Sequence, residues 1–161
     1  MSEKKIVSGV LSQTGKNIVV KVSAKHTPSE YFVDRGGLYV WSNFKDRILG
    51  KAAPTKAGAS FKLNSFKLKK DSTDEEIENS LPKKHLFSET DVCAVISELI
   101  SKQPNGEEGT LQNNGYANLF YIESCVVSVF WGSVRRYWDV GAWRRGGSQW
   151  RGDDRVFSPA S

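Results

Sequence analysis

The sequence has little of what a disulfide-stabilised, metal-binding or membrane-spanning protein needs. Its two cysteines, Cys93 and Cys125, lie far apart and form no Cys-x-x-Cys pair, and the chain has only two histidines. Structural zinc is therefore not expected, and we predict two buried free thiols. No stretch approaches the roughly 20 apolar residues of a membrane span, and the N-terminal MSEKKIVSGV has no apolar run long enough for a signal peptide. We therefore expect a cytoplasmic protein with no membrane span.

Catalytic motifs are also missing. The chain has no GxGxxG, GxxxxGK[ST], HExxH or GxSxG pattern. His26 and His85 have no carboxylate nearby in sequence to orient them, and the acidic run from Asp74 to Glu76 is typical of a solvated helix start. We expect no enzyme, no catalytic or metal-ligating residues and no cofactor.

The composition that is present is that of a folded protein. Hydrophobic residues make up 39% of the 161 residues and charged residues 25%, and five prolines leave no long disordered tract. The length predicts a single domain, residues 1–161. We divide it into an N-terminal hairpin and strands (1–70), helices and scaffold (71–130), and a candidate ligand-binding segment (131–161). The net charge of +5 is a moderate excess that does not establish nucleic-acid binding.

The N-terminal part is expected to be mostly strands. Apolar and polar residues alternate on both sides of the turn-forming segment 14–17, which predicts a β-hairpin over residues 5–25. A strand is expected from Leu38 to Trp41, with Ser42 capping a helical turn that carries Phe44, Ile48 and Leu49. Alternation on both sides of Asn64 and Ser65 predicts strand over residues 60–70.

Two helices are predicted in the middle of the chain. The first follows an N-cap at Ser72 or Thr73, has acidic residues in its first turn, and stops at Pro82. The second lies within SETDVCAVISELISKQP, residues 88–104, where Ser88 caps the start and Pro104 ends the helix. Its core-facing stripe consists of Val92, Ile96 and Leu99.

Strands are expected again after the helices. NLFYIESCVVSVFW, residues 118–131, reads as one or two strands, and nothing after it looks helical. The predicted fold class is therefore α+β, with antiparallel N- and C-terminal strands side by side and two helices between them.

The segment WGSVRRYWDVGAWRRGGSQW, residues 131–150, holds four of the five tryptophans and interleaves two kinds of residue. The scaffold kind is large or apolar and falls at regular intervals. It comprises Trp138, Val140, Ala142, Trp143, Trp150, Arg155 and Phe157. The residues of the second kind have no chemical property in common. It comprises Ser133, Val134, Arg135, Arg136, Tyr137, Asp139, Gly141, Arg144, Arg145, Arg151, Asp153 and Asp154. We expect Trp138, Val140 and Ala142 to be buried, and Arg136, Tyr137 and Asp139 to be more exposed.

These features resemble the variable proteins of diversity-generating retroelements. The W-x-V-x-A strand, the second Trp and the closing RVFS carry the resemblance at the C-terminus. EIENSLPKKHLFSETDVCAVISELISKQ and GYANLFYIESCVVSV carry it before them. It extends from about Asp71 to the end of the chain. It implies a C-type lectin-like fold that displays C-terminal side chains as a ligand-binding surface, after an error-prone reverse transcriptase has rewritten adenines in their codons.

The residue types of the segment fit this mechanism. An AAC codon randomised at both adenines becomes NNC, which encodes Ser, Val, Arg, Tyr, Asp and Gly but never Trp or Gln. All twelve residues of the second kind are permitted, whereas the tryptophans and Gln149 must be fixed or coded differently. The implied partner is an unknown protein or other macromolecule. The residue types are also those of antibody binding loops.

Two alternatives remain open. Alternating tryptophans in a terminal strand are also typical of a plain structural core. From another functional class, a small basic single-stranded nucleic-acid-binding protein would use the same arginines and aromatic residues for phosphate contact and base stacking. Against it, no RNP-like or OB signature is present, and aspartates interrupt the basic stripe.

Overall fold

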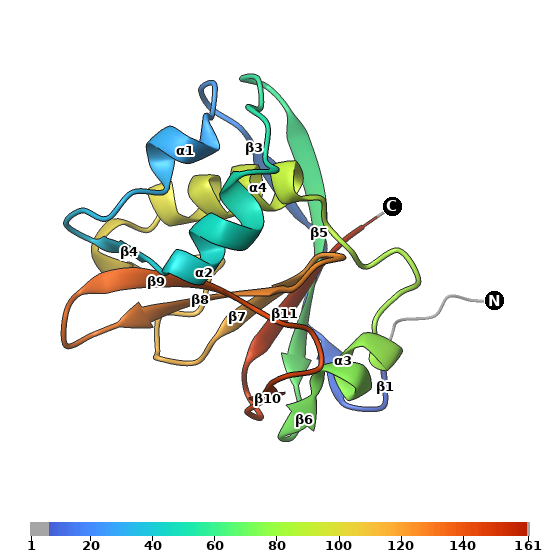
Figure 1. Cartoon of the computed structure of the whole chain (residues 1–161). Coiled ribbons are helices and arrows are strands. Elements are labelled where there is room, and N and C mark those ends of the chain that lie inside the picture. Colours follow the sequence, from blue (N-terminus) through green and yellow to red (C-terminus); the bar gives the residue numbers. More distant parts are fainter. Residues whose placement is uncertain (1–6, 161) are drawn as a thin grey trace.

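The structure, a computed structural model, describes residues 7–160 and has one large sheet with helices on both faces (Figure 1). This agrees with the predicted α+β class. In chain order the elements are β1 (Val7–Ser8), β2 (Leu11–Gln13), β3 (Ile18–Lys21), α1 (Pro28–Tyr31), β4 (Leu38–Val40), α2 (Ser42–Phe44), a π-helical turn (Lys45–Leu49), β5 (Ser60–Leu68), β6 (Ser72–Thr73), α3 (Asp74–Ser80), α4 (Glu89–Ser101), a 3-10 turn (Pro104–Gly106), β7 (Asn118–Tyr121), β8 (Val126–Gly132), β9 (Tyr137–Trp143), β10 (Gln149–Trp150) and β11 (Arg155–Pro159).

The strand order joins the two ends of the chain. The large sheet runs β1-β2-β5-β11-β7-β8-β9-β4, and β3 pairs with the other half of β5. The C-terminal strand β11 lies in the middle, antiparallel to β5 and parallel to β7. At one edge, β4 from the N-terminal part pairs in parallel with β9. The expected antiparallel pairing of N- and C-terminal strands is therefore confirmed for β5 and β11 and wrong for β4 and β9, which run in the same direction. The strands β1 to β5 of the N-terminal part belong to the same sheet as the C-terminal strands.

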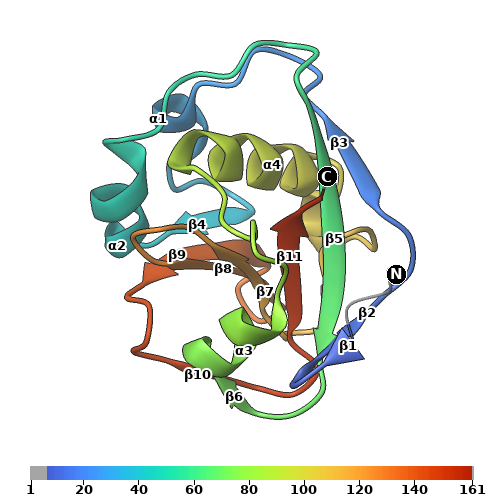
Figure 2. The ribbon, with the colours of Figure 1, turned by 90° about the vertical axis from the view of Figure 1, so that its right-hand side faces the viewer.

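The long helix α4 covers one face of the sheet, as Figure 2 shows. Ser88 caps it through a 3.0 Å hydrogen bond from the Asp91 backbone N–H, as predicted. The expected apolar stripe is buried against the sheet, and it consists of Val92, Ile96 and Leu99. The thiols of Cys93 and Cys125 are free and buried, which confirms that prediction as well. Burial raises the pKa of Cys93 to about 12, and that of Cys125 is also raised.

The short helix α3 covers the opposite face over β5, β7 and β11. Thr73 is its N-cap, and Thr73 and Glu76 form a reciprocal capping box. Ile77 and Leu81 pack with the second faces of these strands and with the β1–β2 hairpin. The predicted helix start and its end before Pro82 are confirmed.

The strand β5 contributes to both cores because its apolar pattern changes phase. Leu63 faces the α4 side, whereas Phe66 and Leu68 face the α3 side. Since side chains alternate along a strand, the pair Asn64-Ser65 moves the apolar residues from one face to the other without a turn. The sequence alternation on both sides of Asn64 thus belongs to one continuous strand.

The predicted N-terminal hairpin is wrong in its strand pairing and in the position of its turn. The segments on either side of residues 14–17 do not pair with each other, because β2 and β3 each pair with a different half of β5. The tight hairpin lies instead at Gly9-Val10, between β1 and β2, where Gly9 has a φ of 57°. Lys5 and Ile6 of the predicted hairpin lie outside the described residues.

The helical turn after β4 also differs at its start. Trp41, and not Ser42, is the N-cap, and no side chain caps the turn. Phe44 and Ile48 are fully buried on one face as predicted, although the chain between them continues as a π-helical turn.

The C-terminal half follows the expected pattern. Residues 118–131 supply two strands, and residues 118–160 contain no helix. Over residues 7–160, no helix has the length and apolar character needed to cross a membrane.

Candidate functional site

The second face of the sheet is open where it extends beyond α3. There β8, β9 and β4 present their outward side chains, while the alternate residues Trp138, Val140 and Ala142 are buried against α4. The outward side chains are rich in rings. We call this set the aromatic face, and it consists of Tyr39, Trp41, Phe130, Tyr137 and Trp143. Tyr39 and Trp41 are 36% and 38% exposed, which is unusual for such large side chains.

Four of these rings form a continuous row. Tyr137 stacks on Tyr39 with centroids 5.4 Å apart. Tyr39 meets Trp41 edge to face at 5.7 Å, and Trp41 meets Trp143 in the same manner at 5.6 Å. Offset and edge-to-face contacts of this kind stabilise aromatic pairs, so the row holds its own arrangement.

Hydrogen bonds fix the indole rings in place. Trp41 Nε1 donates to Asp139 Oδ1 at 2.7 Å, and Trp143 Nε1 donates to Ser128 Oγ at 2.9 Å. Burial raises the pKa of Asp139, and the bond from Trp41 partly opposes this shift. The rings therefore show their faces to solvent while their polar edges point inward.

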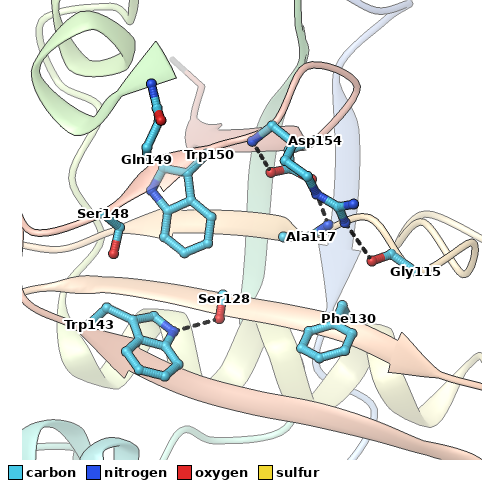
Figure 3. Close-up of a pocket in the computed structure, with 10 residues that line it drawn as sticks. Gly115, Ala117, Ser128, Phe130, Trp143, Ser148, Gln149, Trp150 and Asp154 are labelled. Carbon is cyan, nitrogen blue, oxygen red and sulfur yellow. Dashed lines mark hydrogen bonds between the residues drawn. The ribbon is translucent and has the colours of Figure 1, made fainter. Parts of the chain in front are cut away.

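A pocket of about 540 Å³ lies at one end of the aromatic face, where the chain from β9 to β11 crosses over β8. Trp143, Trp150 and Phe130 supply its three rings, and Figure 3 shows Trp150 opposite the other two. Trp143 and Trp150 were expected to be scaffold, and both are half-buried pocket walls. The volume is that of a small-ligand site.

Asp154 and Arg151 form another wall of the pocket. The Asp154 carboxylate is buried and accepts hydrogen bonds from the backbone N–H groups of Ala117, at 2.8 Å, and Arg151, at 2.9 Å. Burial raises its pKa, which these two hydrogen bonds oppose. The Arg151 guanidinium lies 4.6 Å from the centroid of the Tyr116 ring and donates to the Gly115 carbonyl at 3.2 Å.

A polar network anchors the pocket wall to α3. Asp74, 1% exposed, accepts three hydrogen bonds: from Tyr121 Oη at 2.7 Å, Gly146 N at 2.7 Å and Trp150 Nε1 at 2.8 Å. One turn later, Glu78 accepts from Arg145 Nη2 at 2.6 Å. The segment that carries Trp150 is thus held by two carboxylates of one short helix.

His85 completes this network on the other side of Glu78. Its Nε2 lies 2.8 Å from Glu78 Oε1, and its Nδ1 lies 2.9 Å from the Pro82 carbonyl oxygen. Both neighbours are oxygen atoms that can accept a hydrogen bond, so the ring lies between Glu78 and the chain segment at Pro82.

The structure separates the twelve residues expected at the ligand-binding surface into three classes of exposure. The exposed residues are Ser133, Val134, Arg135, Arg136, Arg144, Arg151 and Asp153. Tyr137 and Arg145 are half-buried. Asp139, Gly141 and Asp154 are buried, so the expected exposure of Asp139 is wrong.

Each buried residue has a structural reason. Asp139 accepts the Trp41 indole N–H, and Asp154 accepts two backbone N–H groups. Gly141 lies under the Trp143 indole, and an added Cβ would come within 3.2 Å of that ring. Residues buried in contacts of this kind are not freely exchangeable.

The exposed members form two groups at opposite ends of β9. Ser133 to Arg136 make the β8–β9 turn, where Val134 is 93% exposed and Arg136 has a φ of 58°. Arg144, Arg151 and Asp153 follow the other end of β9. Of these, Arg151 lines the pocket, and Asp153 forms a 3.1 Å ion pair with Lys67 of β5. The seven residues of β9 separate the two groups by about 20 Å.

The expected scaffold residues are placed as follows. Trp138, Val140, Ala142 and Phe157 are buried as expected. Arg155 is half-buried and donates to the Thr110 carbonyl at 3.0 Å. Burial lowers its pKa.

Tyr39 and Trp41 are members of the aromatic face that the sequence analysis missed. They lie in LYVW, where Leu38 and Val40 alternate with two large aromatic residues. A strand with apolar residues at every position is expected to be covered on both faces. The fold covers only the face of β4 that carries Leu38 and Val40, and the face that carries Tyr39 and Trp41 stays partly exposed.

Comparison of the chain with protein-family models, with curated proteins and with solved structures finds no match.

Proposed function

We propose that this chain is a ligand-binding display protein with a C-type lectin-like fold, in which retroelement mutagenesis diversifies exposed positions of the C-terminal segment. The observation that carries the proposal is the position of the exposed residues. Seven of the twelve positions are exposed, and they lie beyond the two ends of β9, a strand of the aromatic face whose indole rings are held by internal hydrogen bonds. Exchange at such positions alters the surface and leaves the core contacts intact.

The exchangeable set is narrower than the sequence alone indicated. Asp139, Gly141 and Asp154 are excluded because the fold uses them. Arg145 belongs with them, since its guanidinium holds Glu78. The remaining positions are Ser133 to Tyr137, Arg144, Arg151 and Asp153.

Backbone geometry at two exposed positions also fits the AAC codon. Arg136 and Asp153 have φ values of 58° and 80°, in the left-handed region. Asn, which AAC encodes, tolerates this region better than most residues other than glycine. An unedited codon would therefore place a compatible residue at each turn.

The stability of two sets of variants tests the proposal. Changing Ser133, Val134 and Arg144 together to Asn should leave the melting temperature nearly unchanged, since exposed substitutions usually cost under about 0.5 kcal/mol each. The matched change Asp154→Val uses another NNC residue and should cost about 2 kcal/mol or more, because it leaves two buried N–H groups without acceptors. Unfolding of the triple variant would overturn the proposal.

The neighbouring DNA gives a second test. The proposal requires a reverse transcriptase gene and a near-copy of the 3′ coding region that differs from it only at adenines. Differences at the codons of Trp138 or Asp154 would contradict the assignment of these residues to the scaffold.

Single-stranded nucleic-acid binding is the second candidate, and one observation favours it. The exposed rings of Tyr39 and Trp41 lie on or directly after β4, which pairs with β9, and exposed arginines at positions 135, 136 and 144 flank the two ends of β9. Bases stack on such rings, and arginines contact phosphates. Micromolar binding of a labelled oligonucleotide that weakens steeply as salt rises would replace the first proposal with this one.

A further inference from the structure

We infer that the pocket between Trp143 and Trp150 is a binding site for a planar aromatic group that carries a carboxylate. The inference rests on the proposed function only in treating residue 151 as exchangeable. The pocket itself is built mainly from residues outside the exchangeable set, among them Trp143, Trp150 and Phe130. It therefore supplies a constant part of a binding surface whose surroundings vary.

The shape and lining of the pocket favour a flat ring. Trp150 faces Trp143 and Phe130 across the pocket (Figure 3). Both indole N–H groups are used inside the protein, by Asp74 and Ser128, so the rings offer their faces to a ligand. A planar aromatic group makes offset and edge-to-face contacts with such walls.

A sugar ring fits the polar groups of this pocket poorly. Hydroxyl groups need several fixed partners when they are buried. The Ser128 hydroxyl already accepts from Trp143, and both Asp154 oxygens accept backbone N–H groups. Within residues 7–160 this leaves Ser148 as the one hydroxyl of the lining without a hydrogen bond to the protein, which is too few for the several hydroxyl groups of a sugar. The amide of Gln149 points away from the three rings in Figure 3.

Arg151 provides the charge preference. It lines the pocket and forms no ion pair within residues 7–160, and its one side-chain hydrogen bond goes to the Gly115 carbonyl. The Asp154 carboxylate lies nearby, but its oxygens are held by backbone N–H groups instead of the guanidinium. Several guanidinium N–H groups thus remain for a carboxylate at the edge of the ring.

Titrations of 15N-labelled protein, followed through the indole N–H signals in NMR spectra, test the site. Indole-3-propionate should shift the signals of Trp143 and Trp150 saturably and leave that of the buried Trp138 unchanged. Indole-3-propionamide, which lacks the charge, should bind about tenfold more weakly, or about 1.4 kcal/mol, because it loses the charge-assisted hydrogen bonds of the carboxylate. Absence of saturable shifts at Trp143 and Trp150, or equal affinity for acid and amide, would overturn the inference.

Two arginine variants isolate the charge. Arg151→Asn should remove the preference for the acid over the amide, whereas Arg144→Asn, at an exposed arginine outside the pocket, should keep it. A preference that survives Arg151→Asn would also overturn the inference. A short peptide ending in phenylalanine with a free carboxylate, titrated in parallel, distinguishes a chain end from a small acid as the source of the ligand.

The pocket inference and the display proposal can be overturned independently of each other. The melting temperature of the triple Asn variant decides the display proposal, and the probe titration does not enter it. If the triple Asn variant folds normally but indole-3-propionate does not bind the protein, only the pocket inference is overturned.

Discussion

The Asp74 carboxylate joins three parts of the chain that are far apart in sequence. Tyr121 of β7, Gly146 of the loop and Trp150 of β10 all donate to it, and its own position is the first of α3. A helix start is a favourable place for a carboxylate. The same residue that begins the helix therefore fixes the position of a pocket wall.

Asp74→Ala is expected to lower the free energy of unfolding by about 3 kcal/mol or more. It leaves a buried hydroxyl, an indole N–H and a backbone N–H without their acceptor, and each such loss costs roughly 1–3 kcal/mol. Denaturant unfolding measures the change. The matched variant Glu75→Ala, exposed in the same turn, should lie within about 0.5 kcal/mol of the unsubstituted protein. Equal effects of the two variants would show that the network contributes little.

Asp139→Asn should make the stability of the protein less dependent on pH. Burial raises the pKa of Asp139 above its ordinary 3.8, so the folded state disfavours the charged form. The loss of stability that comes from burying the charged Asp139 is absent below pH 3.8. It develops as the pH rises through the pKa that Asp139 has in the folded protein. The Asn variant keeps an oxygen for Trp41 and carries no charge, so it should be the more stable protein at pH 7 and lose this advantage at pH 3.

Melting temperatures at the two pH values measure this effect. Asp46→Asn, at an exposed position of the π-helical turn, serves as the control. An advantage of Asp139→Asn that is the same at pH 3 and pH 7 would contradict the assigned cause.

At the scale of elements, α4 is the helix that packs on the sheet with most of its length buried. Nine consecutive residues of it, from Val92 to Ile100, are buried. A helix buried over so much of its circumference is covered on several sides. The sheet, α1 and the turn after β4 all contribute to this cover.

Leu99→Ala should therefore cost about 2–5 kcal/mol of unfolding free energy through lost burial and the cavity left behind. The control is Leu86→Ala, because Leu86 is 39% exposed and its truncation should cost less than about 1 kcal/mol. Chemical denaturation of both variants makes the comparison. A loss under about 0.5 kcal/mol for Leu99→Ala would show that the core tolerates its removal.

Local patterns were sufficient to predict α3, α4 and the longer strands, but not the short helix α1. Ser88, Thr73 and the two prolines carry start and stop signals that act within a few residues, so α3 and α4 were found at their correct places. The pairing of strands was less accessible. The alternation around residues 14–17 is the same whether β2 and β3 face each other or lie along a third strand.

The candidate site was predicted only in part, for a related reason. The alternation in β9 correctly assigned Trp138, Val140 and Ala142 to the core. It could not show that Asp139 receives the Trp41 indole N–H, because that partner lies on a strand from the other half of the chain. The pocket depends on Asp74 and Trp150, which are also brought together only by the fold.

For the whole molecule, β5 links the two cores, since its alternate faces contribute to each. The N-terminal part consequently has no core of its own that could persist when the rest unfolds. We expect a single cooperative transition. Loss of helical circular dichroism and loss of tryptophan fluorescence should coincide on a urea titration. Two separate midpoints would show that the cores on the two faces unfold independently.

The central position of β11 has a consequence for how the protein is made. Arg155 to Pro159 must enter between β5 and β7 before either strand has both neighbours. The strands β5 and β7 therefore cannot be joined into one sheet until the ribosome has translated the chain from β8 through β11. A frameshift anywhere in that interval replaces β11 with unrelated sequence, and the polypeptide is left with two unpaired strand edges in the middle of its sheet. The last strand to be translated is thus the one on which both of its neighbours depend for a second partner.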